Sequence, residues 1–195
     1  IANNRVYDVL GMINQVPAEV MREHPVFQIF YAWQLAFEQK YAEAEALIEE
    51  VSTRLIQGRG KGMHVGLTEL LVSTQLLKAL VLLYQDKLEY CLKVCQQWLS
   101  MVLTNQPIFR ASLSCIQASA HVLLNNFAQA QKSIALARES LQYTDSEYLL
   151  VMVSMIEALT CKERGELQLA QAQAEIARER VALVFGPHSR VGGPL

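Results

Sequence analysis

The stretch Ala-Trp-Gln-Leu-Ala-Phe-Glu-Gln-Lys-Tyr-Ala-Glu-Ala at residues 32–44 decides the fold, because the chain repeats its pattern three more times. A small residue is followed nine positions later by a large apolar residue, and three positions after that by a second small residue. The pattern recurs at 79–91, 118–130 and 158–170, at intervals of 47, 39 and 40 residues. Its members are Ala32, Ala79, Ala118 and Ala158, which we call the marker alanines; Tyr41, Leu88, Phe127 and Leu167; and Ala44, Cys91, Ala130 and Ala170.

We interpret each copy as two antiparallel helices joined by a tight turn. The first small residue lets the second helix cross closely, the large residue fills the gap at the turn, and the second small residue faces the first. One pair cannot bury its own apolar stripe, so the pairs must stack. The sequence predicts an all-α fold, a right-handed superhelix of about four antiparallel helix pairs, forming one domain over residues 1–195. The alternative is a helical bundle without repeats.

The amino-acid composition, with few Gly and Pro residues, is consistent with a helical fold. Apolar residues make up 52% of the chain, and 9 Gly and 5 Pro among 195 residues are too few for a β-sandwich with its frequent turns. We expect a helix over 3–15 that belongs to a partial N-terminal repeat and a short linking helix over 17–22. Residues 186–195 should be extended or poorly packed. Because the first residue is Ile1, we expect the chain to be a fragment of a longer protein.

Charge and cysteine content exclude several classes of function. A net charge of −2 argues against direct nucleic-acid contact, which needs a basic excess on one face. The most apolar stretch, 70–84, is interrupted by polar residues, so we expect no membrane span. Four cysteines without a CxxC pair predict reduced thiols and a cytoplasmic protein.

The repeated pattern resembles the tetratricopeptide repeat, although its period is about 40 residues rather than 34. The stretch 16–25, Val-Pro-Ala-Glu-Val-Met-Arg-Glu-His-Pro, followed by Tyr31-Ala32-Trp33 and by Tyr-Ala-Glu-Ala-Glu-Ala-Leu at 41–47, is similar to the helical repeat region of MalT-type regulators of the LuxR class. Phe-Gly-Pro-His-Ser at 185–189 resembles the loop that leads into a further repeat there.

The resemblance implies a signal-transducing region of a transcription regulator, which senses an effector and contacts other proteins. Its partners would be a small-molecule effector or a partner protein, together with the ATPase and DNA-binding modules of the same polypeptide. ATP would bind the separate signalling module, since this chain has no Walker A motif and carries no cofactor of its own. Self-association is a further expectation. A freestanding tetratricopeptide-type adaptor for a partner protein or peptide is the alternative.

In tetratricopeptide-like stacks the first helix of each pair lines a groove, and fixed steps from the marker alanines give candidate ligand-binding residues. Aromatic rings among them would suit a sugar, an acyl chain or a peptide, and serines would orient the ligand. Packing against neighbouring repeats is the alternative role for each residue. The candidates are Ile29, Trp33, Phe37, Leu76, Leu80, Tyr84, Ser112 and Ser119.

We find no arrangement that predicts catalysis or a metal site, so we expect a non-enzyme; a helical lyase or terpenoid-type enzyme would need clustered inward-facing Asp or Glu. The Gly-rich run 58–62 lacks the Ser or Thr of a phosphate loop. His121 stands where Leu35 and Leu82 stand in earlier pairs, which predicts a hydrogen-bonded core histidine, with a ligand or pH-sensing role as the alternative. Cys91 and Cys95, four apart, fall at inward positions and are explained by packing. The acidic residues of 38–50 mostly belong to a solvated helix face.

Overall fold

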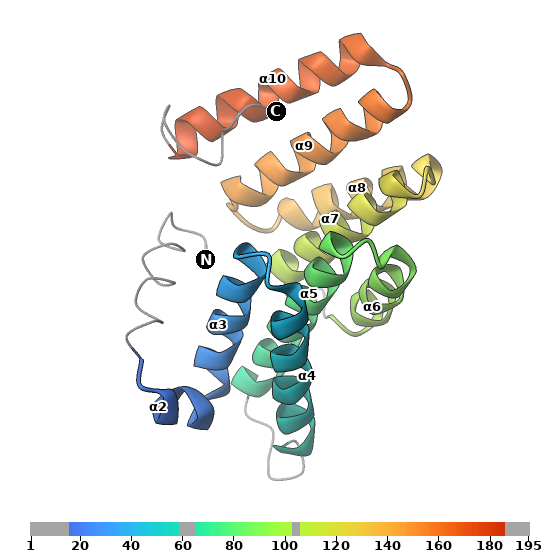
Figure 1. Cartoon of the computed structure of the whole chain (residues 1–195). Coiled ribbons are helices and arrows are strands. Elements are labelled where there is room, and N and C mark those ends of the chain that lie inside the picture. The colour runs from blue at the N-terminus through green and yellow to red at the C-terminus, as the bar shows by residue number, and fades with distance from the viewer. Residues whose placement is uncertain (1–15, 59–64, 103–105, 186–195) are drawn as a thin grey trace. The chain divides into compact units, whose positions relative to one another are not determined.

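The structure, a computed structural model, describes residues 16–58, 65–102 and 106–185 (Figure 1). Helices make up 86% of these residues, and no strand occurs among them, which confirms the predicted all-α class. The expected helix over 3–15, most of the Gly-rich run and the segment 186–195 lie outside the described residues. The helices are α2 (Ala18–Glu23), α3 (Pro25–Phe37), α4 (Tyr41–Gly58), α5 (Val65–Tyr84), α6 (Leu88–Met101), α7 (Pro107–Leu123), α8 (Phe127–Leu141), α9 (Glu147–Glu163) and α10 (Leu167–Phe185).

The starts of the early helices follow from proline. The linking helix predicted over 17–22 is α2, preceded by Pro17. Pro25 and Pro107 occupy the first turns of α3 and α7, where the missing N–H has no partner to lose and the fixed φ already suits a helix. At the N-termini of α3 and α7 no side chain caps the helix, so proline is the local start signal that the sequence provides.

A turn of one geometry joins the two helices of each pair. The residue seven positions after each marker alanine adopts left-handed φ, and the N–H of the following residue bonds to a carbonyl five residues earlier. This is the Schellman motif, which satisfies carbonyls at a helix end. The predicted register is thus present in all four pairs. The left-handed residues are Gln39 (62°), Asp86 (59°), Asn125 (58°) and Gly165 (79°), and the bonds run from Lys40 to Leu35, Lys87 to Leu82, Asn126 to His121 and Glu166 to Cys161, at 2.8–2.9 Å.

Among the four left-handed turn residues, Gly165 is the one glycine, and replacing it tests the turn geometry. A Cβ built on Gly165 meets no atom within 4 Å, so Gly165→Ala costs only the left-handed backbone conformation. We expect a loss of about 1 kcal/mol in the free energy of unfolding, measured by urea denaturation. Gly66→Ala, at the second residue of α5 and equally unobstructed, is the control and should stabilise by up to about 0.5 kcal/mol, because the residue lies in the first turn rather than in the helix interior. Equal effects at both sites would contradict the turn geometry.

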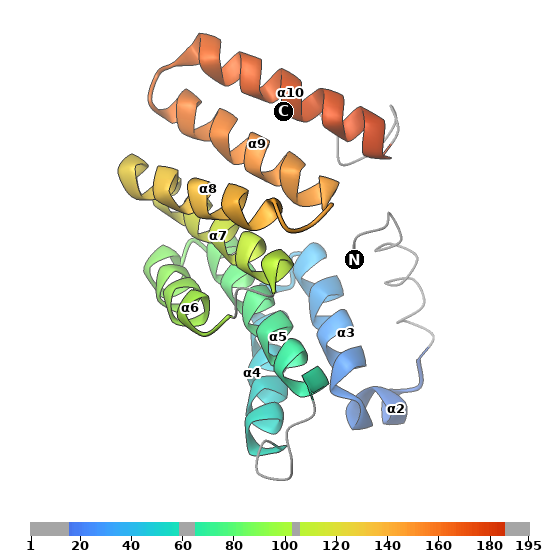
Figure 2. The same ribbon diagram turned by 180° about the vertical axis from the view of Figure 1, so that it is seen from behind.

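The described chain divides into two compact units, with the boundary inside α6 between Val94 and Cys95. In unit 1, α3 packs against α4, and α5 packs against both (Figures 1 and 2). In unit 2, α7, α8 and α9 make the same set of contacts, and α10 packs against α9. Each unit therefore shows how one pair receives the first helix of the next. The right-handed superhelix and the single domain over 1–195 stay predictions.

The small residues of the repeat lie mainly in the cores. Ala32 and Ala44 belong to the core of unit 1, and Ala118 belongs to that of unit 2. Ala79, Cys91 and Ala130 are fully buried. The last pair departs from the pattern, because Ala158 is only half-buried and Leu167 is exposed.

Candidate functional site

The predicted groove residues lie in both units. Six of them are on α3 and α5 in unit 1, whereas Ser112 and Ser119 are on α7 in unit 2. Each of these serine hydroxyls donates to a carbonyl of its own helix, Ser112 to Ile108 at 2.8 Å and Ser119 to Cys115 at 3.1 Å. The two hydroxyls therefore retain only their lone pairs, as acceptors, for any ligand.

Three of the six unit 1 candidates are aliphatic, and none of the three is exposed. Ile29 is 6% exposed and lies in the core, while Leu76 and Leu80 are half-buried on α5. Helical spacing placed them on one side of their helices, but it could not say how deeply a neighbouring helix covers that side. The two exposed candidates of unit 1, Phe37 and Tyr84, are both aromatic.

Trp33 and Phe37 form the first ring pair. They are four residues apart on α3, their ring centroids are 5.8 Å apart, and the rings are inclined by 30° in a stacked arrangement. Trp33 packs against the core of unit 1, which fixes its position. Phe37, the last residue of α3, is 50% exposed and so offers its ring to solvent.

Tyr84 and Tyr41 form the second ring pair, with centroids 5.9 Å apart. Tyr84 is the last residue of α5, and Tyr41 is the first residue of α4 and packs against the same core as Trp33. Burial, and secondly the neighbouring Tyr41, raise the pKa of Tyr84, although 54% of the residue is exposed. Tyr41 was missing from the predicted groove, because the repeat pattern gave it only the role of turn plug.

The two ring pairs lie at the same end of unit 1. Both α3 and α5 run antiparallel to α4, so their last residues lie near the first residue of α4 (Figure 1). We call Trp33, Phe37, Tyr41 and Tyr84 the aromatic end. It is built on three packed helices, and a rigid base of this kind holds rings in place without a large loss of side-chain entropy on binding.

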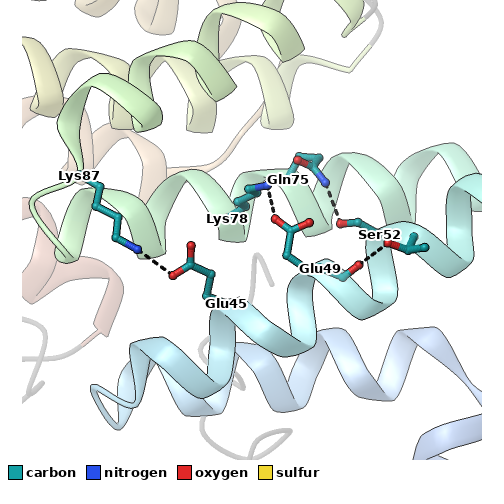
Figure 3. Close-up of polar contacts among 7 residues, drawn as sticks. Glu45, Glu49, Ser52, Gln75, Lys78 and Lys87 are labelled. Atoms are coloured by element: carbon teal, nitrogen blue, oxygen red, sulfur yellow. Dashed lines mark hydrogen bonds and ion pairs between the residues drawn. The ribbon is translucent and has the colours of Figure 1, made fainter.

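A row of polar contacts joins α4 to the α5–α6 segment and begins beside the aromatic end (Figure 3). Lys87 Nζ donates to Glu45 at 3.0 Å, Lys78 pairs with Glu49, and Gln75 Nε2 donates to the buried Ser52 hydroxyl at 2.8 Å. Lys87 is also the main reason why the pKa of Glu45 is lowered. We call these contacts the polar seam. Glu45 and Glu49 therefore form ion pairs with lysines of the next helix pair, whereas the sequence predicted that such residues lie on a solvated helix face.

His121 occupies the repeat position of Leu35 and Leu82, as predicted, since its carbonyl accepts the same turn bond, but the predicted hydrogen bond is absent at the ring nitrogen Nδ1. The ring is half-buried, and its Nδ1 is buried with no hydrogen-bond partner. Burial lowers its pKa, because the charged imidazolium loses hydration. A polar ring in a leucine position is a local departure from the repeat, and its lowered pKa predicts that acid destabilises the folded chain.

We expect His121→Leu to flatten the pH dependence of stability between pH 7.5 and 5. In the wild type the unfolded chain binds the proton at about pH 6.5, before the folded chain does, so stability falls as pH falls through 6.5. It levels off below the lowered folded-state pKa. The measurement is the melting temperature across this range. An unchanged slope in the variant would show that other groups set the acid response.

The cysteines of the described residues lie mostly in buried positions. Cys91, Cys95 and Cys115 are buried thiols outside any disulfide, and burial raises the pKa of Cys115 to about 12. A thiol of such high pKa is a poor nucleophile near neutral pH. Within the same residues, no three His, Cys, Asp or Glu side chains gather to hold a metal ion.

Comparisons with models of known protein families, with curated proteins and with solved structures found no match to this chain. None of the helices in residues 16–58, 65–102 and 106–185 combines the length and apolar character that a bilayer crossing requires.

Proposed function

We propose that this chain is the effector-sensing and protein-interaction region of a MalT-like regulator of the LuxR class. The observation that carries the proposal is the aromatic end of unit 1, where Phe37 and Tyr84 stay about half exposed although each contacts a second ring. A purely structural stack has no need to hold such rings in the solvent. The resemblance of residues 16–47 to that family supplies the biological setting.

The ligand of the aromatic end is a small molecule with an apolar surface that can lie against flat aromatic rings, such as a sugar ring or an acyl chain. Aromatic rings contribute a large contact area at a small entropic cost. Charged groups stand close by, because Glu45 lies one helical turn after Tyr41 and pairs with Lys87. These groups provide hydrogen bonds at the edge of an otherwise apolar platform. The proposal rests on unit 1 alone and leaves Ser112 and Ser119 of unit 2 outside the contact.

In this proposal, the ligand transmits a signal by changing the relative populations of two arrangements of the repeat region. A ligand that binds one arrangement of the repeat region better than another shifts the equilibrium by its differential affinity. In the proposed regulator the shifted region contacts the ATPase module, which binds ATP, and the DNA-binding module makes the nucleic-acid contacts. The chain itself is a cytoplasmic binding region without catalytic residues.

A screen of small metabolites by thermal shift tests the ligand. A compound at 100 times its Kd adds about 2.7 kcal/mol to the free energy of unfolding. We expect Trp33→Ala and Tyr84→Ala each to reduce the shift markedly, whereas Tyr143→Ala, an exposed tyrosine of unit 2, leaves it unchanged. Hits that keep their full shift in both unit 1 variants would remove the aromatic end as the site.

The freestanding adaptor remains the second candidate, because exposed rings on a repeat scaffold also suit a peptide. The complete gene separates the two. A Walker A module upstream and a helix-turn-helix downstream support the regulator, and a short independent reading frame supports the adaptor.

A further inference from the structure

Within each unit there is a junction at which the second helix of one pair packs against the first helix of the next: α4 against α5 in unit 1, and α8 against α9 in unit 2. At the first junction the second helix is acidic and the incoming pair is basic. Glu49 pairs with Lys78 of α5, and Glu45 accepts at 3.0 Å from Nζ of Lys87, in the turn that follows α5 (Figure 3). The two lysines stand one residue before the marker alanine Ala79 and eight residues after it.

At the second junction the signs of the charges are reversed. Arg138 of α8 donates twice to Glu157 of α9, from Nε to Oε1 at 2.7 Å and from Nη2 to Oε2 at 2.5 Å. Glu157 stands one residue before its marker alanine, Ala158, and the residue eight positions after that alanine is Glu166. Glu166 pairs with Arg164 of its own turn at 2.7 Å. The same two repeat positions are therefore both basic in the second pair and both acidic in the fourth.

The receiving helices differ in the matching sense. On α4 the carboxylates of Glu45 and Glu49 stand one and five residues after the small residue of that helix. On α8 the same positions are Gln131 and Ala135, and the charged contact is made by Arg138, about one helical turn further along. At these positions α8 has no acid for an incoming lysine, and α4 has acids where an incoming glutamate needs a base.

An exchange of the two incoming helices would bring like charges together. With α9 on α4, Glu157 would approach Glu49. With α5 on α8, Lys78 would approach Arg138. The side chain of Glu157 is 18% exposed and that of Lys78 is 25% exposed, so solvent and salt screen these charges less than they screen fully exposed ones. Like charges opposed across an interface suppress a wrong partner.

We propose that these charges specify the order in which the helix pairs stack. α4 accepts a pair with basic positions and disfavours the acidic pair formed by α9 and α10, and α8 does the reverse. The spacing of small and large residues cannot make this choice, because all four pairs share it. The charges supply a second signal against docking of a wrong pair from the same chain or from another copy. This device concerns the assembly of the repeats and lies beyond the proposed ligand function.

The first test reverses the charges of the incoming pair in the full chain, with Lys78→Glu and Lys87→Glu together. We expect the equilibrium constant of unfolding in urea to rise at least about fivefold, since two attractive contacts become repulsive. Adding Glu45→Lys and Glu49→Lys rebuilds both ion pairs with exchanged signs and should return the constant to within about twofold of the wild-type value. A quadruple variant as unstable as the double variant would overturn the proposal, because the lysines would then act through packing and not through charge.

The quadruple variant also tests the order itself, because its α4–α5 junction carries the same signs as the α8–α9 junction. Its ion pairs are satisfied in the native structure, but charge no longer distinguishes α5 from α9. We expect refolding from urea at about 100 µM protein to give at least about threefold more dimer and aggregate than the wild type gives, measured by size-exclusion chromatography. Circular dichroism of the monomer fraction confirms that the variant reaches the helical fold.

The matched control is Glu175→Arg combined with Arg178→Glu, which exchanges the signs of an ion pair within α10 and leaves the charged residues of both junctions in place. This control should refold with the wild-type yield of monomer. If the quadruple variant also refolds with the wild-type yield, the proposal is wrong, and apolar packing alone orders the pairs.

Discussion

Leu77→Ala is expected to lower the free energy of unfolding by about 2–5 kcal/mol, the cost of deleting a buried leucine side chain. Leu77 is fully buried in the core of unit 1, where it joins Val81 of its own helix to Leu35 of α3 and Ile48 of α4. Three helices meet at this side chain, so the cavity left behind cannot be filled by a small movement of one of them. Urea denaturation followed by circular dichroism measures the change.

The matched control for this prediction is Leu77→Met. It keeps nearly the same volume, and the expected cost is below about 1.5 kcal/mol. Hydrogen exchange should show the loss of protection in α3, α4 and α5 of unit 1. A loss below 1 kcal/mol for Leu77→Ala would mean that α5 does not hold the two helices of the preceding pair together.

Ala118→Leu is expected to cost about 1–3 kcal/mol by overpacking. Ala118 has no exposed surface and lies in the core of unit 2 with Ala137 and Val153, at the point where α7 meets both α8 and α9. The added methylene and methyl groups have no space there unless the helices separate. A lower melting temperature, with loss of protection in unit 2, is the expected measurement.

The same replacement at Ala135 is the control, because Ala135 is exposed on α8 and leucine is nearly as good a helix former as alanine. We expect a change within about 0.5 kcal/mol there. If Ala118→Leu melts at the wild-type temperature, the small-residue register does not mark the helix crossings.

Local sequence signals were sufficient to predict the helix pairs and the turns that join them. The proline starts of α2 and α3, and the turns at Gln39, Asp86, Asn125 and Gly165, depend on residues within one or two helical turns of each other. The spacing of small and large residues adds which side of each helix is inward. The inward side of a helix follows from the period of its apolar residues, so it can be predicted without knowing which helices pack against it.

The candidate site was predicted only in part. Trp33 and Phe37 are neighbours on one helix, and their spacing of four residues was enough to place them together. The contact between Tyr41 and Tyr84 joins residues 43 positions apart, and the ion pair of Glu45 with Lys87 joins residues 42 positions apart. These contacts depend on how α5 packs against α4, and a local sequence pattern does not predict that packing.

By itself the sequence determined an all-α chain of helix pairs, the positions of the turns, and the small residues that allow close crossings, since backbone sterics and helical period are local properties. Only the tertiary structure decided that Ile29 lies in the core, that Glu45 and Glu49 pair with lysines of the next pair, and that α10 keeps Leu167 and Arg178 exposed. The physical reason is that burial and ion pairing depend on what covers a side chain, and the covering helix comes from a distant part of the chain.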